Sequence, residues 1–231
     1  MPPIYDFMPV SLSDYPGVVA CTVFLPGCNF RCPYCHNGPL VLAGPEGRVP
    51  EGVLFDYLEK RRKLVDGVCV TGGEPTLWND LGAFLEKLKG KGLKVKLDTN
   101  GSRPDALKEF LKDGLVDYVA VDIKAPPAGY ALFTERKEDV EGVIKTVELL
   151  KASQVEYEFR TTVHEKLLSL EDIKAIARWL SGAKRYTLQG YRYSEGVLDV
   201  DFCGKKPCDR AFLEKAMEEI SEHFAEVLVR N

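Results

Sequence analysis

The 231-residue sequence contains no hydrophobic run long enough to span a membrane, and no basic N-terminal region followed by an apolar stretch. The first absence argues against a membrane protein and the second against export, so we expect a cytoplasmic protein with no membrane partner. A strong charge of either sign is also missing. The net charge of −4 provides no broad basic surface, so a nucleic-acid partner is not expected.

Hydrophobic residues make up 45% of the chain and charged residues 29%, which is the balance of an ordinary globular protein. The length fits one domain with a sizeable core. We therefore expect a single domain over residues 1–231, with an extended lead-in at 1–17 and a C-terminal variable segment and helix at 190–231. The sequence shows no internal repeat and no low-complexity tract.

Seven cysteines are present, an odd number without an export signal, which argues for reduced thiols and against a disulfide framework. Cys21 and Cys69 lie in apolar runs, where core packing explains them. Cys203 and Cys208 are too few to hold a cubane cluster of their own. They are incidental residues, a local disulfide, or a pair that faces a substrate or a metal, and the sequence leaves these alternatives open.

The other three cysteines lie within eight residues, at Cys28, Cys32 and Cys35. A short loop lets several sulfurs converge on one metal, and three thiolates on a cubane cluster would leave one iron free to bind a substrate. Two alternatives remain. The spacing also fits one face of a buried helix, although Pro33 argues against it. The second alternative is a closed zinc site, with His36 or a distant residue as the fourth ligand.

Six strand-like runs alternate with amphipathic helical patterns along the chain. The predicted strands are residues 18–25, 67–71, 93–97, 117–124, 155–163 and 185–189, with a short edge strand at 227–229. The predicted helices are residues 51–64, 81–88, 104–114, 140–147, 170–180 and 210–224, the last two capped by Ser169 and Asp209. This alternation predicts an α/β protein with a parallel sheet and outer helices, with too few units for a complete eight-fold barrel.

Polar and glycine-rich segments follow the ends of these strands. They are Gly72-Gly73-Glu74-Pro75, Asp98-Thr99-Asn100-Gly101, Asp122-Ile123-Lys124, Arg160 and Gln189. The C-terminal ends of parallel strands are where such sheets place their active sites. Simple turn formation is the alternative for the first two segments, and a structural ion pair is the alternative for Arg160. Asp122 needs a partner if it is buried, and Lys124 faces the same way.

The cysteine spacing, with the aromatic Tyr34 before the last cysteine, resembles the signature of the radical S-adenosylmethionine (SAM) superfamily. The wider runs 14–17 and 24–37 resemble one branch, the glycyl-radical-enzyme activases, most closely those that activate anaerobic ribonucleoside-triphosphate reductase. The resemblance covers nearly the whole chain. It implies a partial (β/α)6 barrel in which a [4Fe–4S] cluster is bound by Cys28, Cys32 and Cys35.

In such an activase, the reduced cluster cleaves SAM to methionine and a 5′-deoxyadenosyl radical, which removes a hydrogen from a backbone glycine of a partner enzyme. The implied partner is a glycyl-radical enzyme, in first place the anaerobic ribonucleotide reductase. A low-potential electron donor such as flavodoxin or ferredoxin is implied as well. The alternatives are a radical SAM enzyme for another target (a pyruvate formate-lyase type enzyme, a peptide or a nucleoside) and a zinc-binding interaction module without catalysis.

The resemblance also places residues around SAM. The segment from Gly72 to Pro75 matches the one that contacts the amino group of SAM, and His36 and Asn37 match adenine-side backbone contacts. Strand-end carboxylates in the family can hold a monovalent cation beside SAM. The full set of residues implied at the cofactors, beyond the three cysteines, is Tyr34, His36, Asn37, Gly72, Gly73, Glu74, Pro75, Asp98, Thr99, Asn100, Asp122, Lys124, Arg160 and Gln189.

Overall fold

The computed structural model describes residues 1–44 and 46–230, so that Pro45 and Asn231 lie outside the described residues. The chain divides into two compact units. Unit 1 comprises residues 1–29, 39–99 and 105–119, and unit 2 comprises residues 30–38, 100–104 and 120–231. The single domain expected from the sequence stays a prediction, because a division by packing does not show whether either unit folds alone.

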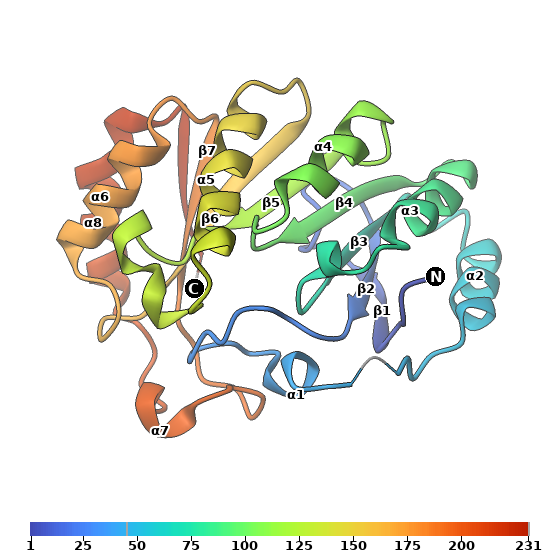
Figure 1. Ribbon diagram of the computed structural model, residues 1–231, viewed down its shortest axis with the longest axis horizontal. Helices are drawn as coiled ribbons and strands as arrows, with labels where there is room; N and C mark the ends of the chain where they lie inside the picture. The colour runs from blue at the N-terminus through green and yellow to red at the C-terminus, as the bar shows by residue number, and fades with distance from the viewer. Residues whose placement is uncertain (45, 231) are drawn as a thin grey trace. The chain divides into compact units, whose positions relative to one another are not determined.

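The strands, labelled in Figure 1, are β1 (Asp6–Ser11), β2 (Ala20–Leu25), β3 (Gly67–Gly72), β4 (Lys94–Thr99), β5 (Tyr118–Asp122), β6 (Glu156–Val163), β7 (Arg185–Gly190) and β8 (Glu226–Arg230). The helices are α1 (Gly38–Val41), α2 (Glu51–Lys60), α3 (Leu81–Gly90), α4 (Pro104–Lys112), α5 (Lys137–Lys151), α6 (Leu170–Leu180), α7 (Val200–Cys203) and α8 (Arg210–Ile220). Short 3-10 helices are η1 (Pro75–Leu77), η2 (Pro127–Leu132) and η3 (Ser221–His223).

In unit 1, the strands β1, β2, β3 and β4 are hydrogen-bonded in chain order. β1 runs antiparallel to β2, whereas β2, β3 and β4 are parallel, with Ala20 opposite Gly67 and Gly67 opposite Lys94. Parallel neighbours need a crossover connection, which α2 and α3 supply. The α/β class predicted from the sequence is therefore observed in this unit.

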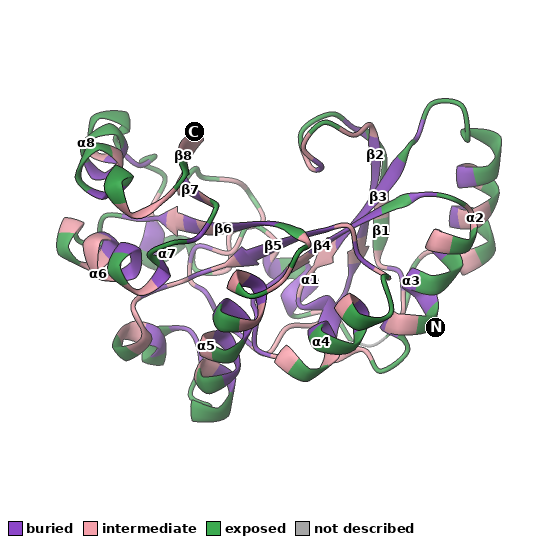
Figure 2. Ribbon diagram, turned by 90° about the horizontal axis from the view of Figure 1, so that it is seen from above, coloured by how far each residue is buried: buried purple, intermediate pink, exposed green. Residues whose placement is uncertain are grey.

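Burial explains why these segments form strands and helices. β2 and β3 are almost entirely buried, as expected for strands covered on both faces, and Figure 2 shows the strands mainly as buried and the outer faces of the helices as exposed. Helix α3 buries Leu81, Phe84, Leu85 and Leu88, the apolar stripe of an amphipathic helix. The core therefore lies between the sheet and the covering helices.

In unit 2, β6, β7 and β8 are parallel and paired in chain order. Helix α6 connects the first two, and α8 connects the last two and packs on α6, β7 and β8. Both predicted caps are confirmed: Ser169 forms a capping box with Asp172, and the Asp209 side chain accepts from the backbone N–H of Ala211. The predicted edge strand is observed as β8.

Strand β1 was not predicted, because its sequence Asp-Phe-Met-Pro-Val-Ser lacks a clear alternation and contains Pro9. Its pairing with β2 depends on contacts that are distant in sequence. The lead-in predicted at 1–17 therefore holds an edge strand. Several helix ends also differ. Helix α2 ends at Lys60, where the chain turns through consecutive basic residues, and α8 ends at Ile220 before η3. Helix α5 extends beyond the predicted range 140–147 at both ends.

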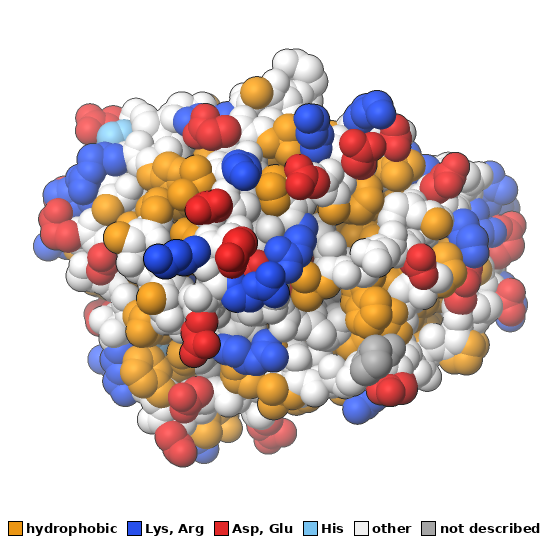
Figure 3. Space-filling model, in the orientation of Figure 1, with side chains coloured by type: hydrophobic (Ala, Val, Ile, Leu, Met, Phe, Trp, Pro, Cys, Tyr) orange, Lys and Arg blue, Asp and Glu red, His pale blue; other side chains and the backbone are white. Residues whose placement is uncertain are grey.

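The surface carries both signs of charge. On the face shown in Figure 3, Lys and Arg side chains are mixed with Asp and Glu side chains. Among the described residues, no helix combines the length and the apolar character that crossing a membrane requires.

Candidate functional site

In unit 1, the buried strand β2 ends at Leu25, and the chain continues through Pro26 and Gly27 to Cys28. The glycine-rich turn after β3 is hydrogen-bonded to this segment. The N–H of Gly73 donates to the carbonyl of Leu25 (2.9 Å), and the N–H of Glu74 donates to the carbonyl of Gly27 (2.8 Å). The turn therefore fixes the backbone directly before the first cysteine.

Both glycines are required by this close approach. Gly72 has φ +127°, a conformation that other residues rarely adopt, and a Cβ there would lie 2.2 Å from the Leu25 carbonyl oxygen. A Cβ on Gly73 would lie 1.8 Å from the carbonyl oxygen of Gly27 and 3.3 Å from the Cβ of Cys28. The turn at Gly72 and Gly73 therefore packs closely against the cysteine loop, in addition to connecting β3 to the next element.

The Glu74 carboxylate is fully buried and ties the turn to β4. Its Oε1 accepts from the Thr76 backbone N–H (3.0 Å), from the Thr76 hydroxyl and from the Thr99 hydroxyl (2.7 Å). Pro75 follows as the first residue of η1. The predicted residues Glu74, Pro75 and Thr99 are thus brought together within unit 1.

Asp98 has a partner that the sequence reasoning missed. Lys96, two residues earlier on the same face of β4, is 1% exposed and its ammonium forms an ion pair with the Asp98 carboxylate. Its Nζ also lies 3.8 Å from the Sγ of Cys69 and 5.9 Å from the ring centroid of Tyr118. The signal was present in the alternation Lys94-Val95-Lys96-Leu97-Asp98, which places a lysine on the same face as the acid.

In unit 2, the loop that carries Cys32 and Cys35 is a turn in which the Cys35 N–H donates to the Cys32 carbonyl (3.0 Å). Tyr34 between them is 4% exposed and packs on Phe133, with the ring centroids 6.0 Å apart. Within the described part of the chain, its hydroxyl has no hydrogen-bond partner. The loop therefore presents two cysteines around a buried ring with an unsatisfied polar atom.

A charged cluster faces this loop. The Asp122 carboxylate accepts from Arg160 Nε at 2.8 Å and lies 3.3 Å from Lys124 Nζ, which is itself 6.0 Å from the Tyr34 ring centroid. The structural ion pair considered for Arg160 is therefore present. Burial alone would raise the pKa of Asp122, but Arg160 and Lys124 outweigh it and hold the pKa well below its usual range.

The electrostatics of the loop follow from the same cluster. Burial would lower the pKa of Lys124, but Asp122, Tyr34 and the two cysteines raise it well above its ordinary value. Burial raises the pKa of Cys35, and the Asn37 backbone N–H and Lys124 act in the opposite direction. The Lys124 charge thus opposes, without outweighing, the burial that raises the pKa of Cys35, and the thiolate is the ligand form that a metal would require.

The charge cluster predicts a pH dependence of stability. The folded-state pKa of Asp122 is depressed, so its contribution is fully present above the unfolded value of about 4 and is lost as the pH falls through the folded pKa. Because the carboxylate is 32% exposed, we expect D122N to lose only about 1–2 kcal/mol at neutral pH. Thermal unfolding of wild type and D122N, measured from pH 7 to 3, should show that the difference in stability between them becomes smaller as the pH falls. A difference that stays constant over this range would contradict the depressed pKa of Asp122. The exposed Glu109→Gln change is the control.

The segment at 191–199, which we call the strap, lies against the same loop within unit 2. The Leu198 N–H donates to the Cys35 carbonyl and the Asp199 N–H to the Pro33 carbonyl, both at 3.0 Å. The Gly38 N–H donates to the Gly196 carbonyl (2.9 Å), and the His36 ring bonds to the backbone oxygen of Arg192. The segment predicted only as variable therefore holds the cysteine loop in place.

Asn100 has a structural role in the described chain, and Gln189 is placed only by its strand. Asn100 accepts from the N–H of Ser102 (2.9 Å) through its side-chain oxygen, which is the turn-forming role weighed for it. Gln189 is the penultimate residue of β7, lies opposite Thr162 of β6 and is half-buried. The assignment of both residues to SAM stays a prediction.

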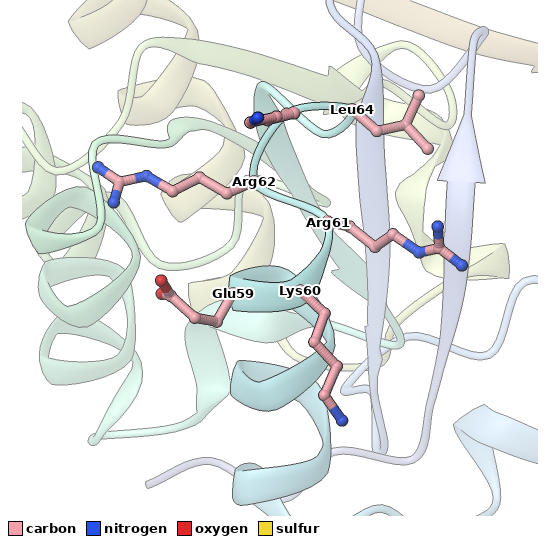
Figure 4. A pocket seen from close by; sticks show the side chains of 6 residues that line it. Glu59, Lys60, Arg61, Arg62 and Leu64 are labelled. Carbon is pink, nitrogen blue, oxygen red and sulfur yellow. The ribbon is translucent and has the colours of Figure 1, made fainter.

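Cys203 and Cys208 are reduced and buried in the structure, without a disulfide between them. They line a cavity of about 260 Å³ together with His164, Glu165, Lys166, Tyr191, Lys206 and Pro207. A separate hollow follows α2 in unit 1. The charged side chains around it, from Glu59 to Arg62, point in different directions in Figure 4, so they do not converge on a ligand.

Taken within each unit, the described residues contain no group of three His, Cys, Asp or Glu side chains placed to hold a metal ion. Cys28 belongs to unit 1, and Cys32 and Cys35 belong to unit 2. The chemistry of the donor set nevertheless fits an iron–sulfur cluster, because none of the described cysteines is in a disulfide and the Lys124 charge opposes the burial that raises the pKa of Cys35. The buried Tyr34 hydroxyl has no hydrogen-bond partner among the described residues, and a bound group would supply one.

The chain belongs to the radical SAM superfamily, whose family model matches residues 22–180. Membership implies an enzyme with a [4Fe–4S] cluster and SAM, and the predicted family and enzyme class are confirmed. A relative from Methanocaldococcus jannaschii, named "Putative glycyl-radical enzyme activating enzyme", is 36% identical over 189 residues, covering 79% of this chain and 77% of the relative. A pyruvate formate-lyase-activating enzyme of Streptococcus mutans is 35% identical over 123 residues, covering 48% of this chain and 46% of that enzyme.

Among solved structures, SuiB of Streptococcus suis, crystallised with S-adenosylmethionine, matches 91% of this chain with a TM-score of 0.69 and 15% identity. This likeness concerns the fold alone, and it confirms the α/β fold of the radical SAM type, consistent with the predicted partial barrel. The chain spans about half of the SuiB chain (52%).

Proposed function

We propose that the protein is a radical SAM activase that generates a glycyl radical on a partner enzyme. The observation that carries the proposal is the relative from M. jannaschii, which is matched over 79% of this chain and named for that activity. The S. mutans relative, which activates pyruvate formate-lyase, supports the same reaction class. Both names support a glycyl-radical enzyme as the substrate.

In this proposal Cys28, Cys32 and Cys35 bind the [4Fe–4S] cluster through thiolates. Once bound there and reduced by a low-potential donor such as flavodoxin or ferredoxin, such a cluster would supply the electron for the cleavage of SAM to methionine and the 5′-deoxyadenosyl radical. The Lys124 charge opposes the burial that raises the pKa of Cys35, and the ammonium offers a cation to the SAM carboxylate. The close packing at Gly72 and Gly73 holds the backbone beside Cys28.

The remaining predicted residues belong to this proposal as contacts that position SAM. The Tyr34 ring is buried within the loop, and the strap holds the backbone of the loop at Cys35 and Gly38. Positioning and exclusion of water are the tasks of the protein in radical chemistry, since the cofactors carry the reaction. The residues proposed to line the SAM site are Tyr34, His36, Asn37, Gly72, Gly73, Glu74, Pro75, Asp98, Thr99, Asn100, Asp122, Lys124, Arg160 and Gln189.

The target we propose first is the anaerobic ribonucleotide reductase, on the resemblance of residues 14–17 and 24–37 to its activases. A pyruvate formate-lyase type enzyme is the second candidate, which the S. mutans relative favours. Reduced, cluster-loaded protein should be incubated with SAM and each candidate, and EPR should show a glycyl doublet with the true partner. SAM cleavage without a doublet on any glycyl-radical enzyme would reject the activase and leave a different radical SAM reaction.

A further inference from the structure

In unit 2, the polar face of the sheet continues from the charge cluster at Asp122 to the last strand. Arg160 of β6 pairs with Asp122. Two residues further along the same face, Thr162 lies opposite Gln189 of β7, and Gln189 lies opposite Arg230 of β8. The carboxyl ends of parallel strands meet at one edge of a sheet, where α/β proteins bind their ligands. Arg230 therefore belongs to the same edge as the residues proposed to line the SAM site.

Helix α8 covers the opposite face of these strands. Tyr186 and Leu188 alternate with Gln189 along β7 and are buried, and the Tyr186 ring stacks on Phe224 with the centroids 4.9 Å apart. Phe224 directly follows η3, which continues from the end of α8, and α8 itself packs on β7 and β8. The face that carries Arg230 is therefore turned away from α8. The Arg230 side chain is 38% exposed, so a molecule outside the chain can reach it.

Among the described residues, Arg230 has one loose ion pair. Its Nη2 lies 3.4 Å from Oε2 of the buried Glu158, whereas a charge-assisted N–H···O bond is ordinarily about 2.7–2.9 Å long. The same oxygen accepts from the Thr187 hydroxyl (3.0 Å), and Oε1 of Glu158 has no hydrogen-bond partner in the described chain. A bidentate pair would use both oxygens. Glu158 therefore anchors the guanidinium but leaves most of its N–H donors available to a ligand.

A guanidinium with free donors is best satisfied by a carboxylate, and the position of Arg230 indicates which molecule would supply it. Lys124, which is proposed to bind the SAM carboxylate, follows β5, and β6 and β7 lie between β5 and β8. Neighbouring strands are about 4.8 Å apart, so Lys124 and Arg230 are separated by about 14 Å along the sheet. The carboxylate is the only negative group of SAM. A second carboxylate, at Arg230, must therefore come from another molecule.

We propose that Arg230 binds an acidic side chain in the glycine-bearing segment of the partner enzyme and so helps to select that partner. The inference rests on the proposed function, because the activase reaction is what brings this segment to the carboxyl ends of the strands. Arg230 acts here as a recognition residue for the partner. The neighbouring cations Lys124 and Arg160 give the edge a positive potential that favours the approach of an acidic segment.

The first test measures peptide binding by fluorescence anisotropy, without radical chemistry, on cluster-loaded protein with SAM. The probes are labelled peptides with the glycine segment of each candidate partner, made as the natural sequence and with every Asp and Glu changed to Asn and Gln. Wild type should bind the natural peptide of its partner at least about tenfold more tightly than the neutral version. Arg230→Met should bind both alike. Arg210→Met, which removes an exposed arginine of α8, is the matched control and should keep the preference.

The second test follows glycyl radical formation by EPR at a series of partner concentrations. Arg230→Met should raise KM for the partner at least about tenfold and change kcat less than about twofold, and Arg230→Lys should recover part of the loss. If Arg230→Met does not fold, because it removes the cation paired with the buried Glu158, Arg230→Lys takes its place and should show an intermediate KM.

Equal binding of the natural and neutral peptides to wild type overturns the inference, as does a folded Arg230→Met protein with the wild-type KM. In either case a glycyl doublet would still form on the partner, and the proposed function would stand. If no candidate acquires a doublet and none of the peptides binds, the activase proposal itself fails, and the role of Arg230 fails with it.

Discussion

Replacing Cys28, Cys32 or Cys35 with alanine, one at a time, is expected to lower the iron content at least about tenfold and to abolish SAM cleavage, because two thiolates cannot hold a cubane cluster. The folded state should survive, since Cys28 and Cys35 are half-exposed residues of a loop and Cys32 adds only a small buried side chain. Iron and sulfide analysis with circular dichroism measures both effects on the same sample.

The matched control for this experiment is Cys208→Ala, a buried cysteine that lines the cavity near the C-terminus. It should keep full iron content and SAM cleavage. Loss of iron in Cys208→Ala as well would show that Cys208 also contributes to cluster binding, which the proposal does not include. Full iron content in any of the three loop variants would contradict the proposed ligand set.

Gly73→Ala should be the most damaging substitution outside the cysteines. Its Cβ would lie 1.8 Å from the Gly27 carbonyl oxygen, which is backbone and has no flexible side chain to move away. The turn or the cysteine loop must shift, and the hydrogen bond from Glu74 to Gly27 is lost with it. We expect a loss of about 2–4 kcal/mol in unfolding free energy and at least a tenfold weaker SAM affinity.

Gly90→Ala is the control for this change, because nothing lies within 4 Å of a Cβ there and the residue ends a helix. It should be neutral or stabilising by a few tenths to about 1 kcal/mol. Denaturant unfolding and equilibrium dialysis with SAM compare the two variants. A Gly73→Ala protein with native stability and affinity would show that the close approach to Gly27 is dispensable.

The sequence predicted the parts of the fold and site that local patterns encode. The apolar runs located β2 through β8, and Ser169 and Asp209 marked helix starts that the structure confirms. The glycines at 72 and 73 were correctly singled out, and their φ angle and close contacts explain why no other residue serves there. These features depend on a few neighbouring residues, so they are readable without knowing the tertiary structure.

What the sequence did not reveal depends on contacts between distant segments. Strand β1 is defined by its pairing with β2 and not by its own composition. The strap bonds to the cysteine loop through backbone groups, which no side-chain pattern records. The ion pair between Lys96 and Asp98 could have been predicted, because Lys96 lies two residues away on the same face of the strand. The complete burial of the Lys96 side chain could not be predicted from the sequence.

The most direct test is the metal in protein purified without oxygen. Elemental analysis and Mössbauer spectroscopy should find about four iron and four sulfide per chain, with one iron site whose signal changes when SAM is added. That result would match three cysteine ligands and one position open to SAM. A single tetrahedral zinc with four ligands from the protein, and no iron or sulfide, would contradict it and remove the catalytic role.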